Sequence, residues 1–436
     1  MTEKKIIDKI RKGLHGEVQV PGDKSISHRS IMLSALGSTP VKITNFLYAQ
    51  DCLSTAAVME ALGADIKIHS DTELIVTGHG FHGLHEPDTI LDAGNSGTTL
   101  RLLLGLLSAQ PFFSVFTGDA SLHKRPMGRV VKPLSQMGAT IYGRQENKNL
   151  PLAIVPAKGK LHGFTYQSPV ASAQVKSAIL LAGMYADSAT TVVEPVVSRD
   201  HTERMLAAFG VPTEKQGTAV TIRPVAENDY KAPEAIEVPG DISSAAYWLV
   251  AGTILPNSDL LLRNVGVNET RTGILNVLEQ MGAKFTLENE RISGGEAAAD
   301  IHVETSQLHG TSFGAEIMPR LIDEIPIIAV AALLAKGETV ITGAGELRVK
   351  ETDRLAAIET EMNKLAPGAV TATEDGLVIR GGQKLKKASC FTYDDHRIAM
   401  SLAILGAAGE GVELENPDCV NISYPDFYAT LARLQK

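Results

Sequence analysis

One stretch near the start of the chain carries the residue types that hold anions. It reads Val20-Pro21-Gly22-Asp23-Lys24-Ser25-Ile26-Ser27-His28-Arg29 and joins a Pro-Gly turn to a helix. A helix N-terminus offers N–H groups and the positive end of the helix dipole, and Lys24 and Arg29 add two full charges there. We expect Ser25 or Ser27 to cap this helix. Taken alone, the stretch also fits an ordinary capped core helix with solvated charges.

Repetition favours a binding role for this stretch. Its opening returns in the second half as Val238-Pro239-Gly240-Asp241, again followed by a small and apolar helix. Six helix openings with a polar start and an apolar continuation recur every 71 to 80 residues, counted at Ser25, Ser96, Ser172, Ser243, Asp323 and Asp395. Such regularity indicates six copies of one structural unit. If the apolar helices of each half run parallel, their six N-termini can converge on one cleft.

A second marker places the other elements of each unit. Glycines that read as helix C-caps, each leading into an alternating strand, stand at Gly63, Gly138, Gly210, Gly282 and Gly368. Each unit therefore contains an amphipathic helix, several strands and a nearly all-apolar helix that must be buried on all sides. Three units form one half, with the helices inside and the sheets outside. We expect one domain from residues 21–238 and another from residues 1–20 plus 239–436, with hinges near Pro21-Gly22 and Pro239-Gly240.

Bulk composition excludes several classes of protein. A net charge of -9 on 436 residues argues against sequence-independent nucleic-acid binding, which needs a surplus of Lys and Arg. Cys52, Cys390 and Cys419 share no Cys-x-x-Cys spacing, which favours a reducing compartment. The longest apolar run, residues 325–335, is too short for a membrane span, and the N-terminus has no apolar signal region. We expect a soluble, cytoplasmic protein with no membrane or nucleic-acid partner.

Five motifs together resemble the 5-enolpyruvylshikimate-3-phosphate synthase family, from about residue 15 to residue 428. They are Gly22-Asp-Lys-Ser-Ile-Ser-His-Arg29, Leu91-Asp-Ala-Gly-Asn-Ser-Gly-Thr-Thr-Leu-Arg101, Arg125-Pro-Met127, Arg348-Val-Lys-Glu-Thr-Asp-Arg354 and Asp394-Asp-His-Arg397. The resemblance implies two inside-out α/β barrel domains, each of three βαβαββ repeats. It implies transfer of the enolpyruvyl group of phosphoenolpyruvate to the 5-hydroxyl of shikimate 3-phosphate, with release of phosphate. It also implies a monomer without metal or organic cofactor, and the target of glyphosate.

The resemblance assigns roles to single residues. The implied catalytic set has Asp323 accepting the hydroxyl proton, Glu351 protonating the methylene carbon with help from Lys24, and His396 orienting one of these groups. The implied shikimate 3-phosphate contacts are Lys24, Ser25, Arg29, Ser172, Ala173, Gln174, Arg199, Asp323 and Lys350. The implied phosphoenolpyruvate contacts are Lys24, Gly97, Arg125, Gln174, Arg354 and Arg397. Taken alone, the motif from Arg348 to Arg354 also fits a solvated helix face.

Some positions depart from the family or leave other functions open. Many members have Lys where this chain has Ile422, so one phosphoenolpyruvate cation is missing or comes from elsewhere, whereas Gly97 argues for glyphosate sensitivity. One alternative is the related transferase acting on UDP-N-acetylglucosamine, whose catalytic Cys is absent from Gly118-Asp-Ala-Ser-Leu-His-Lys-Arg125. A catalytically inactive anion-binding scaffold is another. His79, His82 and His85 lack a Cys or carboxylate shell, and no metal site is predicted from them.

Overall fold

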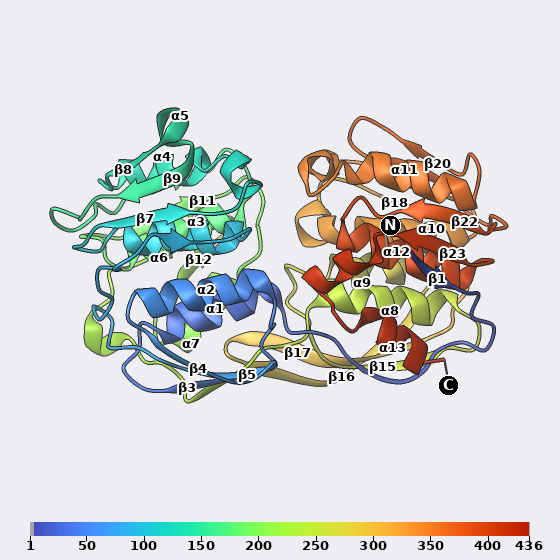
Figure 1. The fold of residues 1–436 in the computed structure, drawn as a ribbon, viewed down its shortest axis with the longest axis horizontal. Helices are drawn as coiled ribbons and strands as arrows, with labels where there is room; N and C mark the ends of the chain where they lie inside the picture. Colours follow the sequence, from blue (N-terminus) through green and yellow to red (C-terminus); the bar gives the residue numbers. More distant parts are fainter. Residues whose placement is uncertain (1–3, 436) are drawn as a thin grey trace. The chain divides into compact units, whose positions relative to one another are not determined.

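The computed structural model describes residues 4–435, which divide into two compact units (Figure 1). Unit 1 contains residues 4–21, Gly240–Arg291 and residues 297–435. Unit 2 contains Gly22–Pro239 and the short segment Ile292–Glu296. Each unit has a hydrophobic core of its own, which is the mark of a separate folding domain.

Unit 2 holds three sheets of four strands with one shared plan. In each, the first two strands in space are parallel and the other two pair antiparallel. In spatial order the first sheet is β14 (Ala235–Glu237), β3 (Val41–Thr44), β5 (Glu73–Thr77) and β4 (Asp65–Ser70). The second is β6 (Leu91–Asp92), β7 (Ser114–Thr117), β9 (Asn149–Ile154) and β8 (Ile141–Gly143). The third is β10 (Thr165–Gln167), β11 (Thr190–Val193), β13 (Ala219–Ile222) and β12 (Glu214–Gln216).

Unit 1 repeats the plan with one shorter sheet. In spatial order its first sheet is β16 (Lys284–Ser293), β17 (Glu296–Glu304), β15 (Asp259–Gly266) and β2 (His15–Gln19). The second is β18 (Ser312–Phe313), β19 (Glu338–Ile341), β21 (Leu377–Arg380) and β20 (Val370–Ala372). The third is β1 (Lys4–Ile7), β23 (Val412–Glu415) and β22 (Ala388–Phe391). The early strand β2 pairs parallel with β15. The described strands form six separate sheets and no closed barrel. The expected α/β class is confirmed.

Six helices are buried on nearly every face, as the apolar repeats predict. They are α1 (Lys24–Ser34), α3 (Gly97–Leu107) and α6 (Ala173–Gly183) in unit 2, and α8 (Ile242–Ile254), α10 (Ile325–Leu334) and α12 (His396–Ala408) in unit 1. Close packing of α3 on α6 depends on Gly105, because a Cβ there would lie 2.1 Å from the carbonyl oxygen of Ala178. The sheets surround these helices within each unit, which confirms the inside-out arrangement. No described helix has the length and apolarity needed to cross a membrane.

The second class of helix ends where the glycines predict. These helices are α2 (Gln50–Ala61), α4 (Gly128–Gln136), α7 (His201–Ala208), α9 (Gly273–Gln280) and α11 (Arg354–Leu365). The predicted glycines all have positive φ, from 73° at Gly368 to 102° at Gly63, a conformation that costs other residues energy. The remaining helices are α5 (Arg144–Asn147), α13 (Phe427–Arg433) and the short 3₁₀ turns Leu122–Lys124, Glu227–Asp229, Met318–Arg320, Ile322–Glu324, Gly345–Val349 and Pro417–Ile422.

The predicted cap of α1 is wrong. The N-cap is Asp23, whose carboxylate accepts the N–H of Ile26, and Ser25 and Ser27 lie inside the helix. The hydroxyl of Ser27 instead accepts the N–H of Leu47. Asp241 takes the same capping position on α8. The Asp of the repeated Pro-Gly-Asp motif therefore starts both helices, because it directly precedes each one and its carboxylate accepts a free N–H of the first turn.

Candidate active site

The N-terminus of α1 carries two of the predicted cations in different environments. Lys24 is partly exposed, and its Nζ lies 2.9 Å from Asp51 Oδ2 on α2. Burial alone would raise the pKa of Asp51, but the charge of Lys24 lowers it, so the carboxylate stays ionised. Arg29 is 5% exposed, and burial lowers its pKa to about 10. Its guanidinium donates to Thr202 Oγ1, Ser177 Oγ and the carbonyl of Ser25, so it fixes the backbone of the helix opening.

Around the start of α3 the structure brings three predicted phosphoenolpyruvate contacts together. Gly97 begins the helix, and a Cβ on it would lie 2.8 Å from Arg101 Nη1 and 3.7 Å from Arg125 Nη1. Arg125 donates to Asn95 Oδ1 at 2.8 Å. Gln174 accepts from Arg101 Nη1 at 2.6 Å. Gly97, Arg125 and Gln174 therefore lie in one polar patch of unit 2.

Arg101 and Asn95 also belong to this patch, although the sequence predicts no role for them. Arg101 is 7% exposed, and burial, reinforced by the nearby charges of Arg129 and Arg125, lowers its pKa to about 9. Its position four residues after Gly97, one helical turn on, is a signal that could have found it, because residues four apart share a helix face. A cation held in so polar and crowded a site is suited to an anionic ligand.

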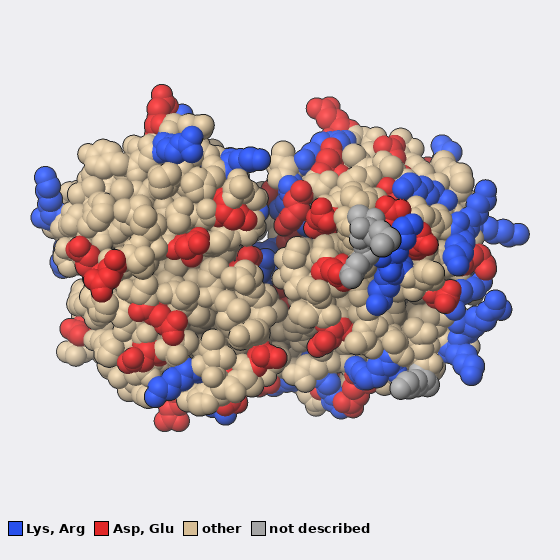
Figure 2. Space-filling view, viewed as in Figure 1, with Lys and Arg blue, Asp and Glu red and all other residues tan. Residues whose placement is uncertain are grey.

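The third helix opening of unit 2 holds three more of the predicted shikimate 3-phosphate contacts. Ser172 is the N-cap of α6, and Ala173 and Gln174 form its first turn. The Ser172 N–H donates to Glu194 Oε1 at 3.0 Å. Arg199 is partly exposed in the loop that leads into α7. On the face of unit 2 seen in Figure 2, Asp and Glu are scattered and few basic residues appear.

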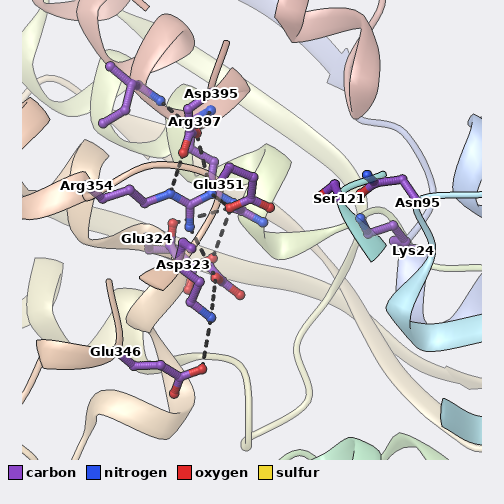
Figure 3. A network of polar contacts seen from close by, with 12 residues as sticks. Lys24, Asn95, Ser121, Asp323, Glu324, Glu346, Glu351, Arg354, Asp395 and Arg397 are labelled. Atoms are coloured by element: carbon purple, nitrogen blue, oxygen red, sulfur yellow. Dashed lines mark hydrogen bonds and ion pairs between the residues drawn. The ribbon is translucent and has the colours of Figure 1, made fainter. Parts of the chain in front are cut away.

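In unit 1, carboxylates and guanidinium groups alternate around the openings of three helices (Figure 3). Arg354 is 1% exposed; its Nε lies 2.8 Å from Asp395 Oδ2 and its Nη2 lies 2.7 Å from Glu351 Oε2. Asp323 lies 3.6 Å from Arg354 Nη1 and 3.9 Å from the ammonium of Lys350. The four predicted residues Asp323, Lys350, Glu351 and Arg354 thus form one cluster, which excludes a merely solvated helix face for the motif that carries them.

Arg397 joins the same cluster from α12. Its Nη1 donates to the carbonyl of Asp323 at 3.3 Å and lies 3.9 Å from Glu324 Oε1. Asp395 caps α12 by accepting the N–H of Arg397 while its other oxygen holds Arg354. Burial would lower the pKa of Arg397, but Asp323 and the other nearby acidic groups raise it, so the guanidinium stays charged. Both guanidinium groups are therefore held by carboxylates.

Glu351 is ionised in this arrangement. Burial alone would raise its pKa, but the charges of Arg354 and Arg397 lower it below its usual value. A proton donor needs a higher pKa than this. An anion that bound Arg354 in place of Glu351 would remove the main attraction that lowers the pKa of Glu351. The pKa of Glu351 would then rise, which would suit its implied role as a proton donor.

The remaining predicted positions contribute less. His396 is 5% exposed and is the first residue of α12, next to Arg397. Ile422 is 50% exposed and ends a 3₁₀ turn. His79 lies 3.4 Å from Asp65, and the described residues hold no group of three or more His, Cys, Asp or Glu side chains placed to bind a metal ion.

Comparisons with known proteins agree over nearly the whole chain. Residues 9–431 match the EPSP synthase (3-phosphoshikimate 1-carboxyvinyltransferase) family. The 3-phosphoshikimate 1-carboxyvinyltransferase of Desulforudis audaxviator is 52% identical over 97% of this chain and 98% of its own. That of Bacillus thuringiensis is 50% identical over 100% of both chains.

Solved structures show the same likeness. The EPSP synthase of Acinetobacter baumannii superposes with a TM-score of 0.92 at 42% identity, covering 99% of this chain and 98% of that one. The enolpyruvyl transferase NikO from Streptomyces tendae shares the fold, with a TM-score of 0.79 at 19% identity over 100% of this chain and 98% of that one. The chain belongs to the EPSP synthase family.

Proposed function

We propose that this chain transfers the enolpyruvyl group of phosphoenolpyruvate to the 5-hydroxyl of shikimate 3-phosphate, with release of phosphate. The reaction belongs to the shikimate pathway, which leads to chorismate and the aromatic amino acids. The observation that carries the proposal is the cluster of Asp323, Glu351, Arg354 and Arg397 in a chain that matches the family over residues 9–431. It supplies a base, an acid and two cations for an anionic substrate.

The proposed chemistry is an addition followed by an elimination. In the addition, the 5-oxygen bonds to C2 of phosphoenolpyruvate, Asp323 takes the hydroxyl proton, and Glu351 gives a proton to C3. In the elimination, Glu351 takes a proton back from C3, the double bond re-forms as the C2–O bond to phosphate breaks, and the proton held by Asp323 leaves with the phosphate. Atoms balance, since two substrates give one enolpyruvyl ether and one phosphate.

The proposed binding set draws on both units. Lys24, Gly97, Arg125 and Gln174 of unit 2 and the two guanidinium groups of unit 1 would hold phosphoenolpyruvate. The residues proposed for shikimate 3-phosphate are Lys24, Ser25, Arg29, Ser172, Ala173, Gln174, Arg199, Asp323 and Lys350. Of these, Arg29 is buried and acts through Ser25 and its neighbours, so we assign it a positioning role.

The alternative acceptor, UDP-N-acetylglucosamine, is not favoured. The loop Gly118–Arg125 contains no Cys, and the curated relatives at about half identity carry the 3-phosphoshikimate name. We further propose a monomer located in the cytoplasm, which size-exclusion chromatography and cell fractionation test.

The decisive experiment measures phosphate release with each acceptor. We expect release only when phosphoenolpyruvate and shikimate 3-phosphate are both present, and none with UDP-N-acetylglucosamine. Asp323→Ala should lower kcat by at least about 100-fold while shikimate 3-phosphate still binds. Glu346→Gln is the matched control, because Glu346 also pairs with Lys350, at 3.2 Å, but is exposed; its kcat should stay within about twofold. Near wild-type turnover by Asp323→Ala would contradict the assigned base.

A further inference from the structure

A buried lysine lies directly beneath two of the loops proposed to hold shikimate 3-phosphate. Lys176 is on α6, two residues after Gln174, and is 1% exposed. Its Nζ lies 3.0 Å from Glu194 Oε2 and 2.8 Å from Glu203 Oε1. Burial alone would lower the pKa of Lys176, but Glu203 and Glu194 raise it, so the ammonium stays charged. None of the residue roles implied by the family resemblance uses this group.

Glu194 connects the ammonium to both loops. Its Oε1 accepts the N–H of Ser172 at 3.0 Å and the hydroxyl of Ser198 at 2.6 Å, and its Oε2 accepts the N–H of Ser198 at 3.2 Å. Glu194 is 3% exposed, and its two carboxylate oxygens accept hydrogen bonds from two separate segments of the chain. Ser172 caps α6 and Ser198 directly precedes Arg199.

Lys176 closes the arrangement on the other side. Its Nζ lies 3.4 Å from the carbonyl oxygen of Ser198, so the loop before Arg199 is held through its N–H, its hydroxyl and its carbonyl. A charged group in so buried a place costs free energy unless its partners are fixed. The pair is therefore stable only when the two loops keep their spacing, which makes it a rigid spacer between Ser172 and Arg199.

The geometry points to a positioning role for Glu194 and Lys176: together they set the distance between the Ser172 and Arg199 loops and so determine the affinity for shikimate 3-phosphate. The inference rests on the proposed function, which places Ser172 and Arg199 on that substrate. It adds two residues that touch no substrate and act through the backbone of those that do. Phosphoenolpyruvate binding is affected less, because Gln174 is its one proposed contact at the α6 opening and its other proposed contacts lie at other helix openings and loops.

Glu203 offers a matched control on the same ammonium. It comes from the first turn of α7, and burial raises its pKa despite the charge of Lys176. Ser172 and Ser198 donate their hydrogen bonds to Glu194 and not to Glu203.

The test compares Glu194→Gln with Glu203→Gln in steady-state kinetics and in calorimetric titration with shikimate 3-phosphate. Glutamine has nearly the same size as glutamate, but its amide nitrogen is a hydrogen-bond donor. In Glu194→Gln this nitrogen would face another donor, either a backbone N–H or the ammonium of Lys176. We expect Glu194→Gln to raise KM and Kd for shikimate 3-phosphate at least about tenfold, with KM for phosphoenolpyruvate and kcat within about threefold. Glu203→Gln should change each value by less than about threefold.

The outcomes separate this inference from the proposed function. Wild-type protein that neither binds shikimate 3-phosphate nor releases phosphate overturns both. If the wild type is active but Glu194→Gln keeps its affinity for shikimate 3-phosphate, the positioning role alone is overturned. The same holds if Glu194→Gln loses affinity equally for both substrates, or if Glu194→Gln and Glu203→Gln lose affinity for shikimate 3-phosphate equally. If Glu194→Gln does not fold, Ser198→Ala decides, because it removes only the hydroxyl donor to Glu194. It should raise KM for shikimate 3-phosphate about threefold with kcat retained, and an unchanged KM would overturn the role.

Discussion

At the scale of single residues, the guanidinium groups of the proposed site already have partners. Arg354 is held by Glu351 and Asp395, Arg397 contacts the carbonyl of Asp323, and Arg101 is hydrogen-bonded to Gln174. An incoming anion would therefore compete with groups of the chain. Glu351 is the partner most easily displaced, because its side chain is 45% exposed while that of Asp395 is fully buried.

Glu351→Gln should consequently separate binding from turnover. Loss of the competing charge at Arg354 should lower Kd for phosphoenolpyruvate by about 1.4- to 5-fold, since a half-exposed ion pair contributes about 0.2–1 kcal/mol. Loss of the proton donor should lower kcat by about 100-fold or more. Equilibrium binding and steady-state kinetics measure the two effects. A higher Kd for phosphoenolpyruvate in Glu351→Gln would contradict competition at Arg354. Glu346→Gln again serves as the control.

At the scale of elements, a bulge in β15 depends on one carboxylate. The register of β15 against β17 shifts between Leu262 and Val265, and Asn264 has φ of 52°. Asp300 on β17 accepts the N–H of Asn264 at 2.8 Å and lies 2.9 Å from Arg263 Nη1. Burial would raise the pKa of Asp300, but the hydrogen bond from Asn264 and its other partners lower it to about 2. The carboxylate thus satisfies a backbone group that the bulge leaves without a ladder partner.

Asp300→Asn should lower the free energy of unfolding by about 2 kcal/mol at pH 7. The folded-state pKa of about 2 lies below the unfolded value near 3.8, so this stabilisation is present above about pH 4 and is lost as pH falls through 2. Urea unfolding should show the gap between wild type and variant shrinking by roughly half at pH 3. Asp187→Asn is the control, because the pKa of Asp187 is also lowered to about 2 but its side chain is 42% exposed. Equal effects of the two substitutions would argue against a special role for the bulge.

At the scale of the whole molecule, the proposed substrate contacts are divided between two units that fold around separate cores. The main chain passes from one unit to the other at Pro21–Gly22 and Pro239–Gly240, and again at each end of Ile292–Glu296. A ligand held by residues of both units favours whichever arrangement lets all of them reach it. We propose the two Pro-Gly crossings as the hinges for that change.

Small-angle scattering tests this proposal directly. Saturating shikimate 3-phosphate should reduce the radius of gyration, because Arg199 and Ser172 of unit 2 and Asp323 and Lys350 of unit 1 are all proposed to bind it. Chloride at the same ionic strength is the control for a general effect of anions, because phosphoenolpyruvate is itself proposed to contact both units. A radius of gyration that shikimate 3-phosphate leaves unchanged would count against hinges at Pro21–Gly22 and Pro239–Gly240.

Local physics explains what could be predicted from the sequence alone. Only glycine adopts positive φ without strain, so Gly63 and the four equivalent glycines mark helix ends wherever the chain folds. A segment apolar on every face, such as Ile325–Leu334, has to be buried. The apolar segments recur six times and the glycines five times, and together they predict the buried helices, their surrounding sheets and the polar openings that carry the candidate site.

Tertiary structure decided which charged groups pair, because a buried charge needs a partner but its sequence does not say which. Arg354 pairs with Asp395, 41 residues away, and Lys176 of α6 pairs with Glu194 in the segment that follows β11. The same limit explains the wrong cap. Asp23, Ser25 and Ser27 all have side chains able to cap a helix, but the fold places the N–H of Leu47 on the Ser27 hydroxyl and leaves Asp23 to cap α1. The sequence determined the helices and the residues at their openings, and the fold determined the ion pairs among those residues, because these join groups far apart in the chain whose distances only packing sets.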